Sequence, residues 1–556
     1  MEQRRIIIVG GVAGGAGAAA RARRTDEHAE IIMYEQGPYI SFANCGLPYY
    51  IGKEIGDRSA LLLQTPESFK DRFNVYVKVH HEVLAIDRAG KTVLVRNLQT
   101  GAEFTESYTA LVLAPGAVPI RPALPGIGLP NIYTVRSVPD SDAIRAFVGH
   151  ECDRRAVVVG GGFIGLEMVE NLLRLGLQVT LVEKADQVLP PLDPEMAAFV
   201  TFTLQQLGAE VVLGDGIAGF AGAERATAVR LESGRVIEAD LFILGIGVRP
   251  DVRLARAAGL EIGASGGISV NERMQTSDPA IYAAGDAVEI INRVTGRPGL
   301  MPLAGPANKQ GRVAGANAAG DRLTFPGALG TAIVRVGETV AAVTGLSEKA
   351  ARSLGMAVLA TYSMSGDHAD YYPGAQQMVI KLVSDRATGR LLGAQAVGGN
   401  GVDKRMDVFA TAIAGKMTVE DLTELDLAYA PPFGSAKDPA VVAGMVAQNV
   451  LRGLTAVLTP AELGARLGAG AELQVLDVRE FFEHMVGALP GAVNIPLDEL
   501  RSRLGELDPG RETVVYDQNG QKAYWASRVL KQNGFGSVVV LTGGYEVWSA
   551  LQSVEG

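Results

Sequence analysis

Near its start the chain reads IIIVGGVAGG (residues 6–15), and the same form returns 150 residues later as AVVVGGGFIG (residues 156–165). In each copy four apolar residues run into a glycine-rich turn, and a stretch typical of a helix follows. A second apolar strand then ends in an acid, Glu35 in the first copy and Glu183 in the second. In a βαβ dinucleotide-binding unit, glycines let the backbone approach a pyrophosphate at the helix N-terminus, and the acid accepts hydrogen bonds from ribose hydroxyls. The sequence therefore predicts two dinucleotide-binding domains.

The second glycine turn is regular, with Gly160, Gly162 and Gly165, whereas the first has Val12 where the middle glycine belongs. A third signal is TSDPAIYAAGD (residues 276–286), an apolar strand that ends in Gly-Asp. Alone, this motif would indicate an ordinary turn after a strand. After two dinucleotide patterns, it favours a cofactor site.

Composition limits the classes of protein that fit. A length of 556 residues predicts three or four domains, and 47% apolar with 20% charged residues is ordinary for a soluble protein. The net charge of −10 argues against nucleic acid as a partner. Two cysteines cannot form a disulfide framework, and the sequence shows neither a signal-peptide core nor an apolar run that approaches a membrane span. We therefore expect a cytoplasmic protein with no membrane partner.

Cys45 lies in SFANCGLPYY (residues 41–50), and the other cysteine, Cys152, is 107 residues away. A closely spaced redox pair is therefore excluded. A lone reactive thiol forms a disulfide with another molecule or oxidises to a sulfenic acid. An inert buried cysteine is the commoner fate of such a residue. Here Gly46 and Pro48 are typical of a loop that starts a helix, where the helix dipole favours a thiolate.

Together, the two glycine turns and the Gly-Asp strand resemble the pyridine nucleotide–disulfide oxidoreductases, over about residues 1 to 450. The resemblance implies FAD on the first fold and NADH or NADPH on the second. It also implies an FAD domain of residues 1–118 and 246–325, an inserted nicotinamide domain of residues 119–245, and an α+β dimerisation domain of residues 326–453. The positions that match the family's contacts to its two cofactors are Gly10, Gly11, Ala13, Gly14, Gly15, Glu35, Ala114, Gly116, Gly160, Gly162, Ile164, Gly165, Glu183, Gly247, Gly285 and Asp286.

The lone cysteine leaves two branches of this family. NADH peroxidases and oxidases carry a catalytic histidine in the first glycine turn, where this chain has Ala13. SFANCGLPYY closely resembles the signature of coenzyme A-disulfide reductases and of relatives that reduce polysulfide or coenzyme A persulfide. This second branch is the one we expect. We expect NADH to be preferred over NADPH, because the Glu183 carboxylate would repel a 2′-phosphate.

In that branch, a tyrosine from each of two loops reaches across a homodimer to the cysteine of the other subunit. Tyr371 and Tyr429 match those positions, and a phenol can donate a proton to a departing thiolate. Basic residues suit the phosphates of coenzyme A. Arg21 and Arg24 lie one helical turn apart, a pattern that on its own is equally typical of a solvated helix face. By resemblance, the coenzyme A contacts are Arg21, Arg24, Ser41, Asn44, Asn308 and Lys437, and no metal site is expected.

The last hundred residues carry VLDVRE (475–480), PGAVNIP (490–496) and LTGGY (541–545), which together resemble a rhodanese-like α/β domain over residues 456–556. The active loop of that family reads Cys-x-x-Gly-x-Arg, and here it reads DQNGQK (517–522). A carboxylate cannot carry sulfur as a persulfide. We therefore expect no sulfurtransferase activity, with the charge of Asp517 filling the backbone nest that would hold a persulfide.

The sequence thus predicts a homodimeric α/β flavoprotein that uses NADH, or alternatively NADPH, to reduce coenzyme A disulfide, coenzyme A persulfide or polysulfide. Cys45 would act as the redox centre through a mixed disulfide with coenzyme A. Two alternatives stay open. One is an NADH oxidase or peroxidase that uses a sulfenic acid, and the other is a redox-sensing scaffold that signals through the C-terminal domain.

Overall fold

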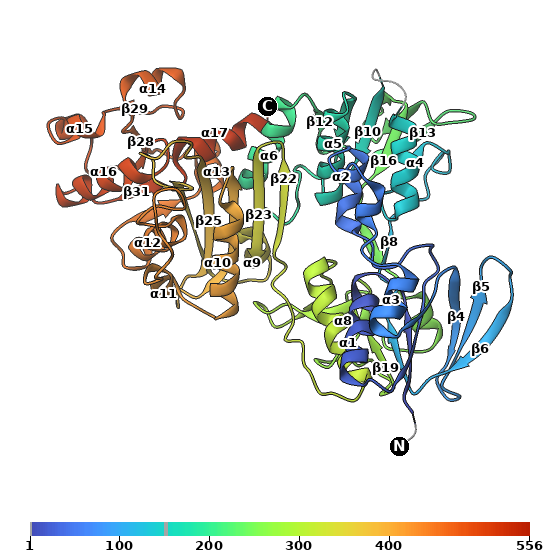
Figure 1. Ribbon diagram of the computed structural model, residues 1–556. Coiled ribbons are helices and arrows are strands. Elements are labelled where there is room, and N and C mark those ends of the chain that lie inside the picture. The colour runs from blue at the N-terminus through green and yellow to red at the C-terminus, as the bar shows by residue number, and fades with distance from the viewer. Residues whose placement is uncertain (1–2, 150–153, 556) are drawn as a thin grey trace. The chain divides into compact units, whose positions relative to one another are not determined.

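The computed structural model describes residues 3–149 and 154–555, so Cys152 lies outside the described residues. Contacts divide the chain into two compact units. Unit 1 contains Met1–Ala185 and Gly208–Gly330, and unit 2 contains Asp186–Leu207 and Thr331–Gly556. Each unit is described by itself below (Figure 1).

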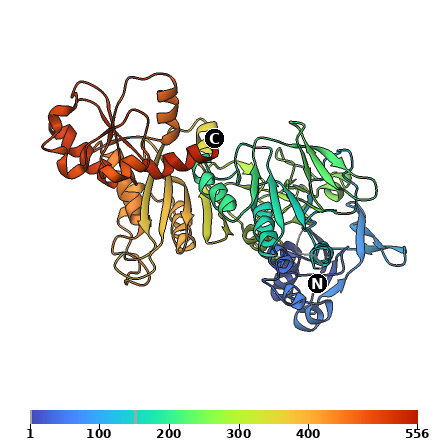
Figure 2. The ribbon, with the colours of Figure 1, turned by 90° about the horizontal axis from the view of Figure 1, so that it is seen from above.

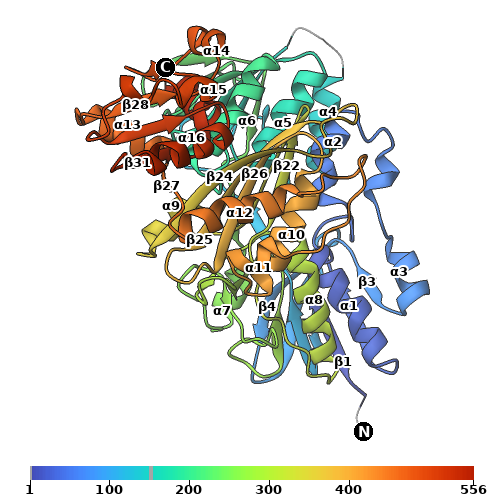
Figure 3. The same ribbon diagram turned by 90° about the vertical axis from the view of Figure 1, so that its left-hand side faces the viewer.

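The first dinucleotide fold in unit 1 is a parallel sheet in the order β19-β7-β1-β2-β3. Its strands are β19 (Ile281–Ala283), β7 (Ala110–Leu113), β1 (Arg5–Val9), β2 (Glu30–Tyr34) and β3 (Tyr76–Lys78). Helix α1 (Ala13–Thr25) follows β1 and packs against α8 (Ala304–Ala318), and Figures 1 and 3 both show these helices side by side. A Cβ at Gly311 of α8 would lie 2.2 Å from the carbonyl oxygen of Gly14 in α1, so this helix contact requires a glycine.

The second fold repeats this plan, as the duplicated sequence pattern predicts. Its parallel sheet has the order β12-β11-β10-β16-β9. The strands are β12 (Glu210–Val212), β11 (Gln178–Val182), β10 (Arg155–Val159), β16 (Leu241–Leu244) and β9 (Ile132–Tyr133), and α5 (Phe163–Arg174) follows β10. Between the two folds, β8 (Ala117–Pro119) pairs antiparallel with β17 (Val248–Pro250), close to residues 118 and 246, where the inserted domain was expected to begin and end.

Unit 2 contains an antiparallel sheet and a parallel one. The antiparallel sheet has the order β22-β23-β26-β25-β24, and α10 and α12 pack against it (Figure 3). Its elements are β22 (Ala332–Val336), β23 (Thr339–Gly345), β24 (Val358–Gly366), β25 (Gln377–Asp385), β26 (Leu391–Gly398), α10 (Val402–Ala414) and α12 (Pro439–Leu451). The parallel sheet has the order β27-β31-β30-β28-β29. Its strands are β27 (Ala456–Leu458), β28 (Gln474–Asp477), β29 (Val493–Asn494), β30 (Thr513–Tyr516) and β31 (Val538–Leu541).

Helix α6 (Pro194–Gln206) belongs to unit 2, although its residues fall within the expected nicotinamide domain. It packs against the C-terminal helix α17 (Gly544–Glu555), and Figures 1 and 2 both show the two helices next to each other. The backbone N–H of Tyr362 in β24 donates to Thr542 Oγ1 at 2.9 Å, which joins the antiparallel sheet to the C-terminal domain.

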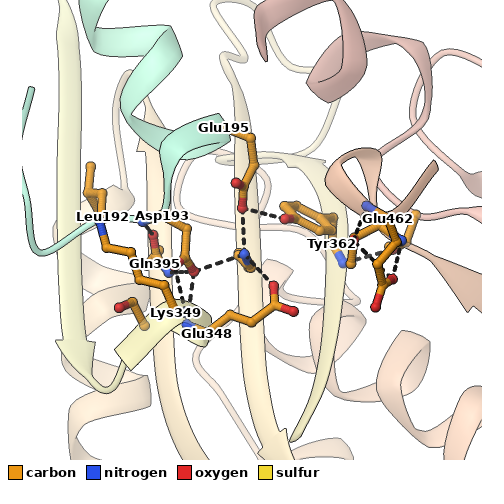
Figure 4. Close-up of polar contacts among 12 residues, drawn as sticks. Leu192, Asp193, Glu195, Glu348, Lys349, Tyr362, Gln395 and Glu462 are labelled. Carbon is orange, nitrogen blue, oxygen red and sulfur yellow. Dashed lines mark hydrogen bonds and ion pairs between the residues drawn. The ribbon is translucent and has the colours of Figure 1, made fainter. Parts of the chain in front are cut away.

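A buried ion cluster joins α6 to the antiparallel sheet (Figure 4). Lys381 of β25 is 1% exposed. Its Nζ lies 2.8 Å from Asp193 Oδ2, 2.5 Å from Glu195 Oε1 and 2.7 Å from Glu348 Oε2. The Tyr362 hydroxyl also donates to Glu195, at 2.5 Å. A buried charge is tolerated when it is paired and hydrogen-bonded, and each of these charges has such partners.

No helix in residues 3–149 or 154–555 is long and apolar enough to cross a membrane.

Candidate active site

The first glycine turn forms a cradle that only glycine permits. Gly10 has a φ of +94°, and a Cβ there would lie 2.1 Å from the Ala114 carbonyl oxygen. A Cβ at Gly15 would lie 1.8 Å from the Gly10 carbonyl oxygen. Glu35 stands at the end of β2, and its carboxylate accepts the backbone N–H groups of Gly11 at 2.8 Å and Gly37 at 2.7 Å. A bare backbone turn at the start of α1, with an acid beside it, fits the pyrophosphate and ribose of a dinucleotide such as FAD.

The other residues expected at this cofactor surround the same turn. Ala13 opens α1 and Gly14 is buried against Ala284, which precedes Gly285 and Asp286. The Gly285 N–H donates to Gln310 Oε1 at 2.7 Å. Gly116, with a φ of +72°, leads into β8. Burial raises the pKa of Asp286, and this effect exceeds the opposing influence of Arg136.

The second glycine turn repeats this geometry. Gly160 has a φ of +106°, Gly162 is the N-cap of α5, and Ile164 and Gly165 lie in its first turn. The Glu183 carboxylate accepts the N–H of Gly161 at 2.6 Å and of Ala185 at 2.8 Å. Lys184 pairs instead with Glu232 at 2.8 Å. Gly247, with a φ of +102°, immediately precedes β17.

Cys45 lies in a single 3-10 turn (Asn44–Gly46), directly before α2 (Leu47–Ile51). The expected start of a helix after the cysteine is therefore present. The expected preference for thiolate is not, because the pKa of the Cys45 thiol is raised. Although the residue is exposed, partial burial of its thiol is the largest cause, and the carboxylates of Glu167 and Asp286 add to it. A helix of five residues offers too little dipole to reverse these effects.

Three residues at the cysteine loop and the helix after it, Arg136, Tyr49 and Glu167, were given no role from the sequence. The Asn44 side-chain amide, in the orientation that satisfies both partners, donates to the Arg136 carbonyl oxygen at 3.0 Å and accepts from Arg136 Nη1 at 2.8 Å. The Tyr49 hydroxyl donates to Glu167 Oε1 at 3.3 Å. Arg136 and Glu167 are distant from Cys45 in sequence, and no local pattern marks them.

Two of the expected coenzyme A contacts, Arg21 and Arg24, lie on α1, and Asn308 lies on the neighbouring α8. Arg21 Nη2 lies 3.5 Å from Asp321 Oδ2, and Arg24 Nε donates to the Ala20 carbonyl oxygen. Ser41 donates its backbone N–H to the Gly11 carbonyl oxygen at 2.8 Å, so the cysteine loop begins next to the first glycine turn. Four of the expected contacts, Arg21, Arg24, Ser41 and Asn308, thus lie on elements that adjoin this turn.

The remaining expected residues lie in unit 2. Tyr371 and Tyr429 are both exposed, and their hydroxyl oxygens lie 3.1 Å apart. Lys437 is exposed and precedes Asp438, whose carboxylate caps α12. Exposed aromatic side chains also include Tyr372 and Phe433.

The C-terminal loop has the arrangement that its sequence predicts. Asp517 is 2% exposed, and its carboxylate accepts the N–H groups of Gly520 at 2.6 Å and Lys522 at 2.9 Å. The carboxylate thus occupies the nest at the start of α16 (Gln521–Gln532). Burial raises the pKa of Asp517, and these amides oppose that effect.

Comparison with known families agrees with this geometry. The profile of the pyridine nucleotide-disulphide oxidoreductases matches residues 4–311, their dimerisation domain matches residues 331–441, and the rhodanese-like domain matches residues 459–551. The chain belongs to the pyridine nucleotide-disulphide oxidoreductases, and it carries a C-terminal rhodanese-like domain.

Among its relatives is the coenzyme A disulfide reductase of Staphylococcus aureus (strain bovine RF122 / ET3-1). It is 35% identical over 437 residues, which are 78% of this chain and 97% of the relative. The structure of reduced CoADR-RHD from Bacillus anthracis is 44% identical, with a TM-score of 0.96 over 100% of this chain and 99% of that one. The NAD-dependent persulfide reductase from A. fulgidus is 37% identical, with a TM-score of 0.91 over 98% of this chain and 100% of that one.

Proposed function

We propose that this chain is an FAD-containing, NADH-dependent reductase of coenzyme A disulfide, coenzyme A persulfide or polysulfide. The observation that carries the proposal is a lone redox cysteine, Cys45, in a loop that begins beside the first glycine turn, in a chain with two dinucleotide cradles. The likeness to a coenzyme A disulfide reductase and to a persulfide reductase supports this substrate class.

FAD, when bound, supplies the passage of two electrons from a nicotinamide to sulfur. The chain's own residues do the rest. The glycine turns and Glu35 hold the dinucleotide, and Glu183 selects a nicotinamide cofactor with free ribose hydroxyls. Cys45, as thiolate, attacks a sulfur of the incoming disulfide and forms a mixed disulfide with coenzyme A while the other half departs as a thiol.

The departing sulfur needs a proton. Tyr371 and Tyr429 form a hydrogen-bonded pair of exposed phenols, and we assign them this role at Cys45 of a second copy in a homodimer. The match to the family's dimerisation domain over residues 331–441 supports the homodimer. Arg21, Arg24, Ser41, Asn44, Asn308 and Lys437 are assigned to coenzyme A. Placement in the cytoplasm stays a prediction, and the low cysteine content favours it.

The oxidase or peroxidase alternative is not favoured. A water-forming NADH oxidase from Lactobacillus brevis shares the fold at a TM-score of 0.78 and 26% identity. However, the position of the catalytic histidine of that branch is Ala13, whose methyl group cannot exchange a proton. The C-terminal domain is assigned a binding or scaffolding role, because Asp517 fills the loop that would carry sulfur.

Mass spectrometry of the purified, non-reduced protein tests the proposal directly. We expect one FAD per chain and a mass increase on the Cys45 peptide equal to coenzyme A in disulfide linkage. NADH-dependent release of free thiol from coenzyme A disulfide should accompany it. Rapid NADH-dependent consumption of oxygen or peroxide, without thiol release, would favour the oxidase instead.

A further inference from the structure

Glu167 of α5 faces the helix that begins just after Cys45. Its Oε1 accepts a hydrogen bond from the Tyr49 hydroxyl of α2 at 3.3 Å. The two helices approach closely, because a Cβ at Gly52, directly after α2, would lie 1.8 Å from Asn171 Oδ1. Asn171 in turn donates its side-chain N–H to the Glu167 carbonyl oxygen at 2.8 Å. The Tyr49–Glu167 contact is therefore part of a close junction between the second dinucleotide fold and the cysteine loop.

The charged groups on neighbouring elements are engaged with other partners. On α4 (Val138–Val148), Asp142 binds Arg58 at 2.7 Å, and Arg145 donates to the Tyr50 carbonyl oxygen at 2.8 Å. On α5, Arg174 pairs with Glu54. Asp286, the other carboxylate that acts on Cys45, is itself influenced by Arg136. Glu167 differs from these carboxylates because its partner is a neutral phenol.

This setting makes the charge of Glu167 variable near neutral pH. Burial raises the pKa of Glu167 to about 7, the bond from Tyr49 opposes the shift, and Glu170 adds to it. The ionised carboxylate raises the pKa of Cys45, and such coupling is reciprocal, so a thiolate at Cys45 favours the protonated form of Glu167. The state in which only one of Cys45 and Glu167 is ionised is therefore favoured over the state in which both are.

We propose that Glu167, held by Tyr49, is a positioning residue for the sulfur chemistry. Glu167 binds a proton when the mixed disulfide at Cys45 is reduced, and the Cys45 sulfur is thereby left as a thiolate. The inference rests on the proposed role of Cys45 as redox centre. Two electrons from the nicotinamide break the S–S bond. The hydrogen nucleus of the hydride, which arrives with these two electrons, goes to the departing coenzyme A sulfur as a proton. Water supplies a second proton, which Glu167 binds. When the thiolate attacks the next disulfide, Glu167 gives up its proton and the second coenzyme A sulfur takes one, so that two thiols leave in each cycle.

The test measures the rate at which iodoacetamide alkylates Cys45 in the reduced holoenzyme between pH 5 and pH 9, by mass spectrometry of the Cys45 peptide. Thiolate is the reactive form. Glu167→Gln removes the like charge, so the midpoint of the profile should fall by about one pH unit, with alkylation up to about tenfold faster near pH 7. Tyr49→Phe should move the midpoint in the same direction by less, because it removes the bond that favours the ionised carboxylate.

Glu54→Gln is the matched control, since it removes the same charge from a residue that also faces α5, through Arg174. FAD content and melting temperature report whether each variant is folded. The inference is overturned if Glu167→Gln leaves the midpoint at the wild-type value, or if Glu54→Gln shifts it as far. Because alkylation measures the reactivity of the thiol without turnover, its result is separate from the search for coenzyme A at Cys45 and from the release of thiol with NADH, which decide the proposed function.

Discussion

The hydroxyl oxygens of Tyr371 and Tyr429 lie 3.1 Å apart, although 58 residues separate them in sequence. This hydrogen bond raises the pKa of Tyr371. A phenol with a raised pKa keeps its proton at neutral pH, so it remains able to donate a hydrogen bond to a departing thiolate. Two exposed phenols that bond to each other therefore fit a shared role as proton donor.

Replacing either tyrosine should slow the release of thiol. Tyr371→Phe is expected to lower kcat for coenzyme A disulfide by about 100-fold, the effect typical of losing one general acid. Tyr429→Phe should act similarly, and the double variant should be less impaired than the product of the two, since the hydroxyls act as a pair. Steady-state kinetics measure this. Tyr372→Phe is the control, because that ring packs against His368 and should leave kcat unchanged.

Cys45→Ser should abolish reduction of disulfide and persulfide, because serine cannot form the mixed disulfide. Reduction of the bound flavin by NADH should remain nearly as fast as in the wild type, since that step needs no sulfur. Rapid mixing followed by absorbance separates the two steps. Cys152→Ser serves as the matched control and should behave as the wild type. A Cys45→Ser enzyme that still turned over coenzyme A disulfide would refute the assignment.

NADH should be used more efficiently than NADPH. Two backbone N–H groups fix the Glu183 carboxylate beside the second glycine turn, where it would repel a 2′-phosphate, while the ammonium of Lys184 pairs with Glu232. Glu183→Ala should therefore reduce the ratio of kcat/KM for NADH over NADPH by about tenfold, or about 1.4 kcal/mol. The control Glu232→Ala leaves the Glu183 carboxylate in place and should keep NADH preferred. Higher efficiency of the wild type with NADPH would contradict the prediction.

The rhodanese-like domain should show no transfer of sulfur from thiosulfate to cyanide. Asp517→Cys is expected to produce measurable thiocyanate, because the N–H groups of Gly520 and Lys522 that now bind the carboxylate could bind a persulfide. The full chain with Cys45→Ser is the background, so that the flavin-side thiol contributes nothing. Asp517→Ser should stay inactive. Robust thiocyanate formation without any change at Asp517 would mean that another group accepts the sulfur.

Lys381→Met should destabilise the protein strongly. It removes the cation that the buried Asp193 and Glu195 and the half-buried Glu348 share, and breaking such a cluster costs about 3–5 kcal/mol. Lys184→Met, at an exposed ion pair, should cost at most about 0.5 kcal/mol. Chemical denaturation measures both. Lys381 also holds the pKa of Asp193 below its usual 3.8 despite burial, so this stabilisation is present above pH 3.8 and is lost as the pH falls through the lower folded value.

Much of the fold could be predicted from the sequence because its signals are local. A strand, a glycine turn, a helix and a terminal acid follow each other within about 30 residues, as in any βαβ unit. Glu35 and Glu183 occupy their expected places for this reason. Contacts between distant segments leave no such signal. Nothing in the strand around Lys381 indicates three carboxylate partners. Likewise, the sequence around Glu167 does not indicate its hydrogen bond with Tyr49. The local helix led us to expect a lowered pKa for Cys45, whereas partial burial of the thiol, together with the carboxylates of Glu167 and Asp286 that are remote in sequence, raises it.

The residence of Asp186–Leu207 in unit 2 has a consequence for anyone who exchanges parts between relatives. A graft of the whole segment 119–245 would carry Asp193 and Glu195 of the donor onto the recipient's Lys381, Glu348 and Tyr362. The graft would then transfer the cofactor preference only together with Asp193 and Glu195 of the donor's ion cluster. Cutting the chain also at residues 185 and 208 would leave that cluster native, and the donor would contribute only the part of the segment that belongs to unit 1.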